Sequence, residues 1–341
     1  MAQQATTLLN TVTLPEFTDL VRREWLETPN LVPYNASKIF IEENLAAHTG
    51  DSKRYNEVDV ETFGKEMKEG EDASKTRAGV GYEKDMNAKR IAREIEITWN
   101  MRRYNRYTQV GSKLISLATF GPQRKELDLT HRLSFAGSTA YTDMDGNSVD
   151  ISTGDSLALV SASHTVPFAS TTYSNLVAGA PVFSQSSLEA AELLAKNNIL
   201  SLFGEKRIMN FNAIITGKDP NTCRAVKQLL NSTADVTAVQ AGVVNVYAGE
   251  YVHIELDYLD TTATGANDST KRRYWFIAAI GQGLQGLQAY CGIFEPNNLK
   301  TPAPGNNGDD VHNDNWTYGT RMSYGIVIPN PRGIIGSLVS S

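Results

Sequence analysis

The feature that most constrains this chain is a strongly charged segment in its first third. Residues 51–96 hold 10 Lys or Arg and 12 Asp or Glu among 46 positions, whereas only 21% of the 341 residues of the chain are charged. Bulky apolar residues are scarce between Glu61 and Asp85, so this part cannot bury enough apolar surface to offset the entropy lost on ordering. The segment is therefore either a solvated loop or a protruding hairpin that becomes ordered against another subunit.

Both ends of this charged segment alternate apolar and polar residues, which is the pattern of a half-buried strand. Val58 and Val60 alternate with acidic residues, and Ile95, Ile97 and Trp99 alternate with polar residues downstream. The alternation favours the hairpin over the loop, and it predicts that the two ends of the segment are the paired strands of that hairpin.

The composition of the whole chain excludes several classes of protein. The hydrophobic share is 41%, the net charge is −6 and the pI is about 5.5, which is unlike a disordered chain or a basic nucleic-acid binder. The longest apolar run, Tyr274–Ile280, has 7 residues, whereas a bilayer span needs about 20, so no membrane association is expected. Cys223 and Cys291 cannot make a disulfide framework, and no secretory leader follows Met1, so we expect a reducing cytosol.

A short helix is expected ahead of the charged segment. Thr13 and Glu16 form a capping pattern, with a proline in the first turn, and predict a helix over Pro15–Glu27. Polar sequence and prolines surround it, so we interpret residues 1–50 as an arm that contacts a neighbouring subunit. The apolar face expected to make these contacts consists of Phe17, Leu20, Val21 and Trp25.

After the charged segment, the apolar period changes from 2 to 3.6 residues. This predicts a long helix from Thr98, its cap, to about Phe120, kinked or restarted at Pro122. An α/β pattern follows, with a helix beginning at the capping box Ser186–Glu189 and another capped by Asp219. Strands are expected over 211–216, 243–247, 251–259, 274–280, 287–293 and 317–328, and a polar loop over 296–315.

We find no motif that supports catalysis. Gly281–Gly286 fits Gly-x-Gly-x-x-Gly after an apolar strand, but β-prone residues follow where a dinucleotide fold needs a helix, so a turn is favoured. The acidic stretches 143–150 and 309–314 depart from the calcium-loop pattern, and a type I′ hairpin turn at Asp145-Gly146 explains the first better. We expect no catalytic residue, no cofactor and no metal, so the chain is not expected to be an enzyme. The histidines lack ligand spacing: His48, His131, His164, His253 and His312.

The order of these parts resembles the major capsid protein of tailed bacteriophages, which has the Hong Kong 97 fold, and in particular the Mu-type major head subunit. Asp155–His164 is similar to the DGLALFSxxH segment of that group, with Ser156 in place of Gly and Val160 in place of Phe. Further segments resemble the family in the same order: Thr172–Asn175, Ser187–Glu192, Asn212–Thr216, Ala225–Ser232, Tyr274–Phe276 and Pro331–Gly333.

The resemblance implies an α+β fold in five parts. These are an N-terminal arm (1–50), an E-loop hairpin (51–97), a P-domain with a spine helix (98–180), an A-domain (181–311) and a C-terminal return to the P-domain (312–341). The E-loop would lie over the P-domain of the next subunit and form intersubunit ion pairs. The charged side chains expected in those pairs are Lys65, Glu66, Lys68, Glu69, Glu71, Lys75, Arg77, Lys84, Lys89 and Arg90.

The resemblance also implies a function and partners. Such chains self-assemble into hexamers and pentamers of an icosahedral shell, which encloses double-stranded DNA without sequence specificity. The protein would be assembled in the host cytoplasm and become part of the virion, with scaffold, portal and decoration proteins as further partners. Because no long helical segment follows Met1, we expect any scaffold to be a separate protein.

Two other functions stay open. An encapsulin-like nanocompartment shell shares the fold but packages a protein cargo, so the co-purified content would distinguish it. A dinucleotide-dependent enzyme would use Gly281–Gly286, and titration with NAD would detect it.

Overall fold

The computed structural model describes residues 12–28, 34–61, 63, 66–73, 75–232, 244–302 and 314–339. The chain is α+β, as predicted. The helices are α1 (Leu14–Glu27), α2 (Trp99–Arg103), α3 (Tyr107–Ser134), α4 (Gln185–Asn198) and α5 (Pro220–Asn231), with short 3-10 turns η2 (Ala36–Lys38), η3 (Ser269–Lys271) and η4 (Gly283–Gln285). The strands are β1 (Ile41–Asn44), β2 (Ser52–Val60), β3 (Ala78–Asn87), β4 (Lys89–Ile97), β5 (Ala140–Thr142), β6 (Ser148–Asp150), β7 (His164–Thr165), β8 (Thr172–Tyr173), β9 (Ala213–Thr216), β10 (Val252–Glu255), β11 (Trp275–Ala278), β12 (Gln288–Lys300), β13 (Trp316–Asn330) and β14 (Ile334–Ser337).

A long four-stranded sheet forms one side of the molecule, in the order β1-β12-β13-β4. The sequence predicts that β4 pairs with the strand at the other end of the charged segment, and this prediction is wrong. β4 pairs with β13 and not with β2, and Ile95 lies opposite Tyr318. Ile91, Ile95 and Ile97 of β4 are buried, so the alternation of this segment serves the core of the body. A period of two identifies a strand and its buried face, but it does not identify the partner strand.

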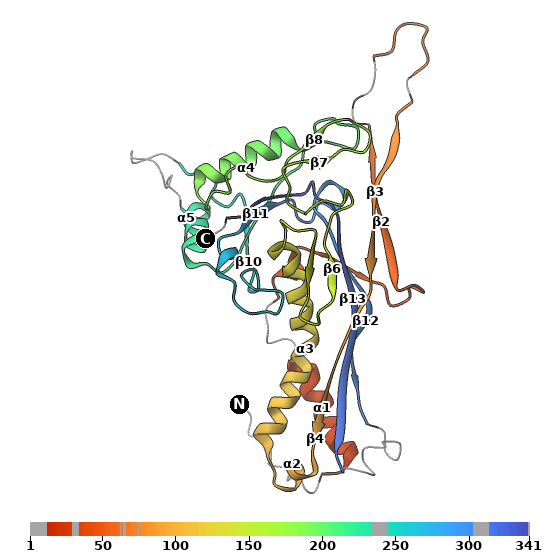
Figure 1. Ribbon diagram of the computed structural model, residues 1–341, viewed down its shortest axis with the longest axis vertical. Helices are drawn as coiled ribbons and strands as arrows, with labels where there is room; N and C mark the ends of the chain where they lie inside the picture. The colour runs from red at the N-terminus through yellow and green to blue at the C-terminus, as the bar shows by residue number, and fades with distance from the viewer. Residues whose placement is uncertain are drawn as a thin grey trace.

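The true hairpin consists of β2 and β3, with Val58 opposite Val80. Figure 1 shows this hairpin running beside β12 and β13, with the loop at its end standing clear of the rest of the chain. The hairpin is therefore shorter than predicted, and its loop projects as the charged composition suggested.

The spine helix differs from its prediction in where it breaks. Thr98 caps α2, accepting a hydrogen bond from the Met101 backbone N–H at 3.4 Å, but the helical path ends after Arg103. The break centres on Asn105, whose φ of 49° is left-handed, a conformation that asparagine tolerates better than most residues. α3 then continues without interruption through Pro122, so the helix does not restart at this proline.

The second sheet, in the order β10-β9-β11-β14, lies at the centre of the globular part. Its central strands are buried on both faces: Ile215 and Phe276 pack toward Leu129 and Leu133 of α3, and Ile214 packs in a second core with α4 and α5. Figure 1 shows α4 and α5 on the outer side of this sheet. Asp219 caps α5 as predicted, accepting from the Thr222 backbone N–H at 3.0 Å.

Several boundaries differ from those expected. α4 begins at Gln185 with Ser184 as its cap, two residues earlier than predicted, because the Ser184 hydroxyl accepts from the Ser187 backbone N–H. β12 continues to Lys300, so the polar loop begins later, and a register shift between Glu295 and Asn298 accommodates a proline in this strand. Residues 246–250 form turns where the end of a strand was predicted, and the first residue of that predicted strand lies outside the described part. Among the described residues, no helix is both long and apolar enough to span a bilayer.

Candidate assembly surfaces

The N-terminal helix packs on its own chain. Phe17 is fully buried, with its ring centroid 5.3 Å from that of Trp316 and 5.8 Å from that of Tyr318, both on β13. Val21 is also buried in this cluster. The expected intersubunit role is therefore wrong for Phe17 and Val21. The residues that cover them come from β4, α3 and β13, far along the chain and beyond the reach of a local pattern.

The other two apolar residues of this helix are less enclosed. Leu20 packs at the edge of the same cluster, and Trp25 is half-buried. Contacts of Leu20 and Trp25 with a neighbouring subunit stay a prediction.

The base of the hairpin is also docked on its own chain. Tyr55 stacks on Tyr290 of β12, with ring centroids 4.4 Å apart. Met86 is buried where Gly292 and Gly325 of β12 and β13 leave room; a Cβ on Gly325 would lie 2.6 Å from the Met86 side chain. These two glycines are needed for this close approach of hairpin and sheet.

A buried ion pair fixes the middle of the hairpin. The guanidinium of Arg332 donates to the carboxylate of Glu57, which also accepts from the Asn330 amide at 2.9 Å. Arg332 donates as well to the backbone carbonyl of Leu200, at 2.5 Å, and lies over the ring of Tyr173. The base of the hairpin, up to Val58, is therefore held in shape by its own chain. The expectation that the whole charged segment needs another subunit for its shape is wrong for this part.

Two of the charged residues expected between subunits are largely buried and form close ion pairs within the chain. Lys84 donates to Asp150 at 2.6 Å, and Lys89 donates to Asp128 at 3.0 Å and to Asp143 at 2.9 Å. These contacts correct the intersubunit role for Lys84 and Lys89. The sequence could not show them, because their partners come from α3, from the β5–β6 turn and from β6.

The remaining charged residues differ in their surroundings. Arg90 is mostly exposed and lies 3.7 Å from Glu295 of its own chain. Lys65 lies outside the described residues. The others are exposed on the hairpin loop, where their intersubunit pairing stays a prediction: Glu66, Lys68, Glu69, Glu71, Lys75 and Arg77.

The outer part of the hairpin also carries apolar side chains that its own chain leaves exposed. Its inner face is attached to the body, since Asp59 accepts from the Leu202 backbone N–H at 3.4 Å and lies 3.5 Å from Arg207. The outer side chains are 48% to 65% exposed, although each is large and apolar. We call them the distal apolar row: Val58, Val60, Phe63, Met67 and Val80.

A buried polar network joins the residues on which the family resemblance rests. His164 bridges Asp155, at 2.7 Å through Nδ1, and Asn175, at 3.1 Å through Nε2. The Asn175 amide donates to the backbone carbonyls of Leu159, Pro331 and Ile334. Because His164 and Asn175 are fully buried, this network holds the C-terminal return in place and offers a substrate no access.

Two details of this network explain its sequence. Burial acts to raise the pKa of Asp155, but hydrogen bonds from His164 and Thr153 outweigh it and hold this pKa below its ordinary value. Ser156 has a left-handed φ of 64°, which accounts for the glycine that the family carries at this position.

The two loop motifs behave as turns. Gly281–Gly286 connects β11 to β12 through η4 and is followed by a strand, as the sequence predicted. Residues 143–147 connect β5 to β6, so the predicted hairpin is confirmed. A type I′ turn needs a positive φ at both central residues. Gly146 has a positive φ but Asp145 does not, so the turn is not type I′. Most of the acidic stretch 309–314, including His312, lies outside the described residues.

No family model matches the sequence, and no curated protein matches it. Among solved structures, the capsid of cyanophage Pam1 is 13% identical, covering 98% of this chain and 96% of that chain with a TM-score of 0.48. The capsid of Ralstonia phage GP4 is 12% identical, covering 100% and 94%, with a TM-score of 0.47. A virus-like particle from Pyrococcus furiosus is 12% identical, covering 93% and 97%, with a TM-score of 0.44.

Proposed function

We propose that this chain is a structural major capsid protein that assembles into hexamers and pentamers of an icosahedral phage shell. One observation carries the proposal: the distal apolar row stands on a hairpin whose base is rigidly anchored but whose outer face its own chain leaves uncovered. Contiguous exposed apolar surface on a soluble protein marks an interaction site. A second copy of the chain is the partner that would cover it in a homo-oligomeric shell.

The apolar row contributes more to this contact than the charges that surround it. Fully burying a Val, Met or Phe side chain stabilises by roughly 1.5–3 kcal/mol, and burying the exposed half by about half of that, whereas an exposed ion pair contributes about 0–1 kcal/mol. The charged loop residues would then set the register of the contact and its sensitivity to salt.

The five-part division inferred from the resemblance is part of this proposal, except that the hairpin consists of β2 and β3 and ends at Asn87, so that β4 belongs to the body. The proposal also includes that the shell packages double-stranded DNA without sequence specificity, that it assembles in the host cytoplasm and that it becomes part of the virion. Scaffold, portal and decoration proteins would be further partners.

Electron microscopy of the purified full-length chain tests the proposal. Closed shells or rings of about six copies are expected, since one interface repeated by rotation gives closed assemblies. A monodisperse monomer at high protein concentration would oppose it. Nuclease treatment of particles from infected cells distinguishes the contents: protected DNA supports the phage shell, and a protein cargo without DNA supports the nanocompartment.

A further inference from the structure

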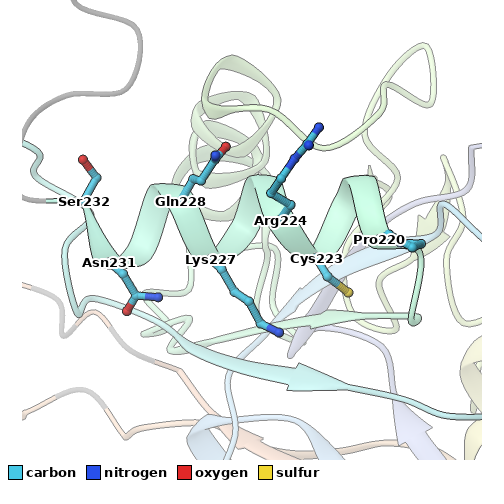
Figure 2. A pocket seen from close by; sticks show the side chains of 7 residues that line it. All are labelled: Pro220, Cys223, Arg224, Lys227, Gln228, Asn231 and Ser232. Carbon is cyan, nitrogen blue, oxygen red and sulfur yellow. The ribbon is translucent and has the colours of Figure 1, made fainter.

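A group of potential metal ligands lies beside α5, away from the hairpin and the arm. The Cys223 sulfur, a His253 ring nitrogen and a Glu255 carboxylate oxygen all lie within 4.8 Å of one another. Cys223 also lines a groove along α5, together with Arg224 and Lys227, among others. Figure 2 shows Cys223 and Lys227 on the same side of α5, pointing toward the adjoining sheet.

Local structure explains why these three residues meet. Successive side chains of a strand point to opposite faces, so His253 and Glu255 of β10 share one face while Ile254, between them, packs in the core on the other. Cys223 lies in the first turns of α5, whose start is fixed by its Asp219 cap. Two independently anchored elements thus present sulfur, nitrogen and oxygen donors to one another.

The contacts among these side chains define what an ion would meet. The His253 Nδ1 atom lies 3.6 Å from a Glu255 carboxylate oxygen, and the Lys227 ammonium lies 2.5 Å from the same oxygen. Cys223 is a free, buried cysteine, so an ion would have to displace its thiol proton, as metals do on binding thiols.

We propose that Cys223, His253 and Glu255 form a binding site for a divalent transition metal ion of the Zn²⁺ type, with water completing the coordination. Mixed sulfur, imidazole and carboxylate donors are a set that Zn²⁺ accepts in tetrahedral geometry. Donors around Zn²⁺ at about 2.0–2.3 Å lie roughly 3.3–3.8 Å apart, so small side-chain rotations would close the site. The ion would tie α5 to β10 and is independent of the shell function proposed above.

Thr216 is the residue that holds the site in its metal-free arrangement. Its hydroxyl lies 2.8 Å from Nε2 of His253 and 3.8 Å from the Cys223 sulfur. The Thr216 hydroxyl thus contacts both the imidazole and the thiol. Lys227 would compete with the metal ion, because its ammonium pairs with the Glu255 carboxylate oxygen that the ion would bind.

Titration of the purified full-length chain with Co²⁺, and with Zn²⁺ against a chromophoric chelator, tests the site. We expect one ion per chain, with the visible and near-ultraviolet absorption of thiolate-bound Co²⁺. Cys223→Ser should abolish the thiolate band, and Cys223→Ser and His253→Gln should each weaken Zn²⁺ binding at least about tenfold, since even losing an outer-shell partner costs 10–100-fold.

The matched control is Cys291→Ser, because Cys291 is the other buried cysteine and lies in the other large sheet. It should leave both the absorption and the affinity unchanged. Absence of Zn²⁺ binding by the wild-type chain would overturn the proposal. Binding that survives Cys223→Ser, or a Co²⁺ spectrum without a thiolate band, would do the same. The wild-type spectrum reports on coordination even if a variant fails to fold.

Discussion

Glu57 and Arg332 form an ion pair whose side chains are only 3% and 2% exposed, and it joins the hairpin to the C-terminal return. Burial lowers the pKa of Arg332 to about 10, so the guanidinium remains charged at neutral pH. The pair lies where the anchored part of the hairpin gives way to the exposed distal apolar row. It therefore sets the direction in which that row projects.

Removing one partner of this pair should destabilise the fold strongly. Arg332→Met leaves the Glu57 carboxylate buried without its counter-ion, and we expect the free energy of unfolding to fall by about 3–5 kcal/mol. Urea denaturation measures the change. Arg54→Met is the control, since Arg54 forms exposed ion pairs with Glu83 and Asp85 on the same hairpin and should change stability far less than Arg332→Met. Equal losses for the two variants would contradict the anchoring role.

Asn175 should be the most sensitive member of the polar network. Asn175→Ala removes the donor of three buried backbone carbonyls and the acceptor of the Ser161 backbone N–H. Each unsatisfied buried group costs about 1–3 kcal/mol, so a loss of at least 3 kcal/mol is expected in the same denaturation assay. The exposed Asn147→Ala should change stability by less than about 0.5 kcal/mol. A small effect at Asn175 would mean that the network is dispensable.

The stability of the fold should depend on pH through His131. Burial, with the nearby cations of Lys271 and Arg124, lowers the pKa of His131 to about 4. In the unfolded chain this group titrates near 6.5, so the unfolded state binds the proton first as pH falls. Stability is therefore full above pH 6.5 and is lost between pH 6.5 and about 4, by up to about 3 kcal/mol.

His131→Gln should flatten this dependence, because glutamine does not titrate. Thermal or urea unfolding of both proteins at several pH values between 4 and 7 gives the difference between their slopes. Parallel pH profiles would show that His131 is not protected from protonation in the folded state.

The sequence predicts much of the local structure and little of the long-range pairing. The caps at Thr13, Thr98 and Asp219 are local patterns, and each appears at the start of a helix as expected. The partners of β4 and of Phe17 lie more than 200 residues away, on β13. Alternation and amphipathicity show that a face is buried, but they do not show which chain segment buries it.

For the assembly surfaces too, the sequence predicts local features but not the contacts made by distant residues. Charge density identifies the projecting loop, yet Lys84 and Lys89 are paired within the chain by residues from α3 and β5–β6. The distal apolar row escapes sequence reasoning because Val58 and Val60 look like ordinary inward-facing strand positions. Only the orientation of the anchored hairpin shows that they point outward.

Charging the distal apolar row should block assembly without unfolding the chain. Val80→Asp adds a charge where an apolar contact is proposed, and because this side chain is half exposed the fold should lose less than about 1 kcal/mol. Sedimentation should show subunits instead of particles, with unchanged circular dichroism. Val58→Ile keeps the row apolar and should assemble normally. Normal particles from Val80→Asp would show that the row is not an interface.

The central claim is that the outer part of this hairpin lies on another copy of the chain. Particles assembled from equal amounts of isotopically light and heavy chains can be treated with a short amine-reactive crosslinker and analysed by mass spectrometry. We predict that crosslinks from Lys68 and Lys75, both exposed on the hairpin loop, join light to heavy chains. Crosslinks from these lysines that connect only residues of the same chain would contradict the account.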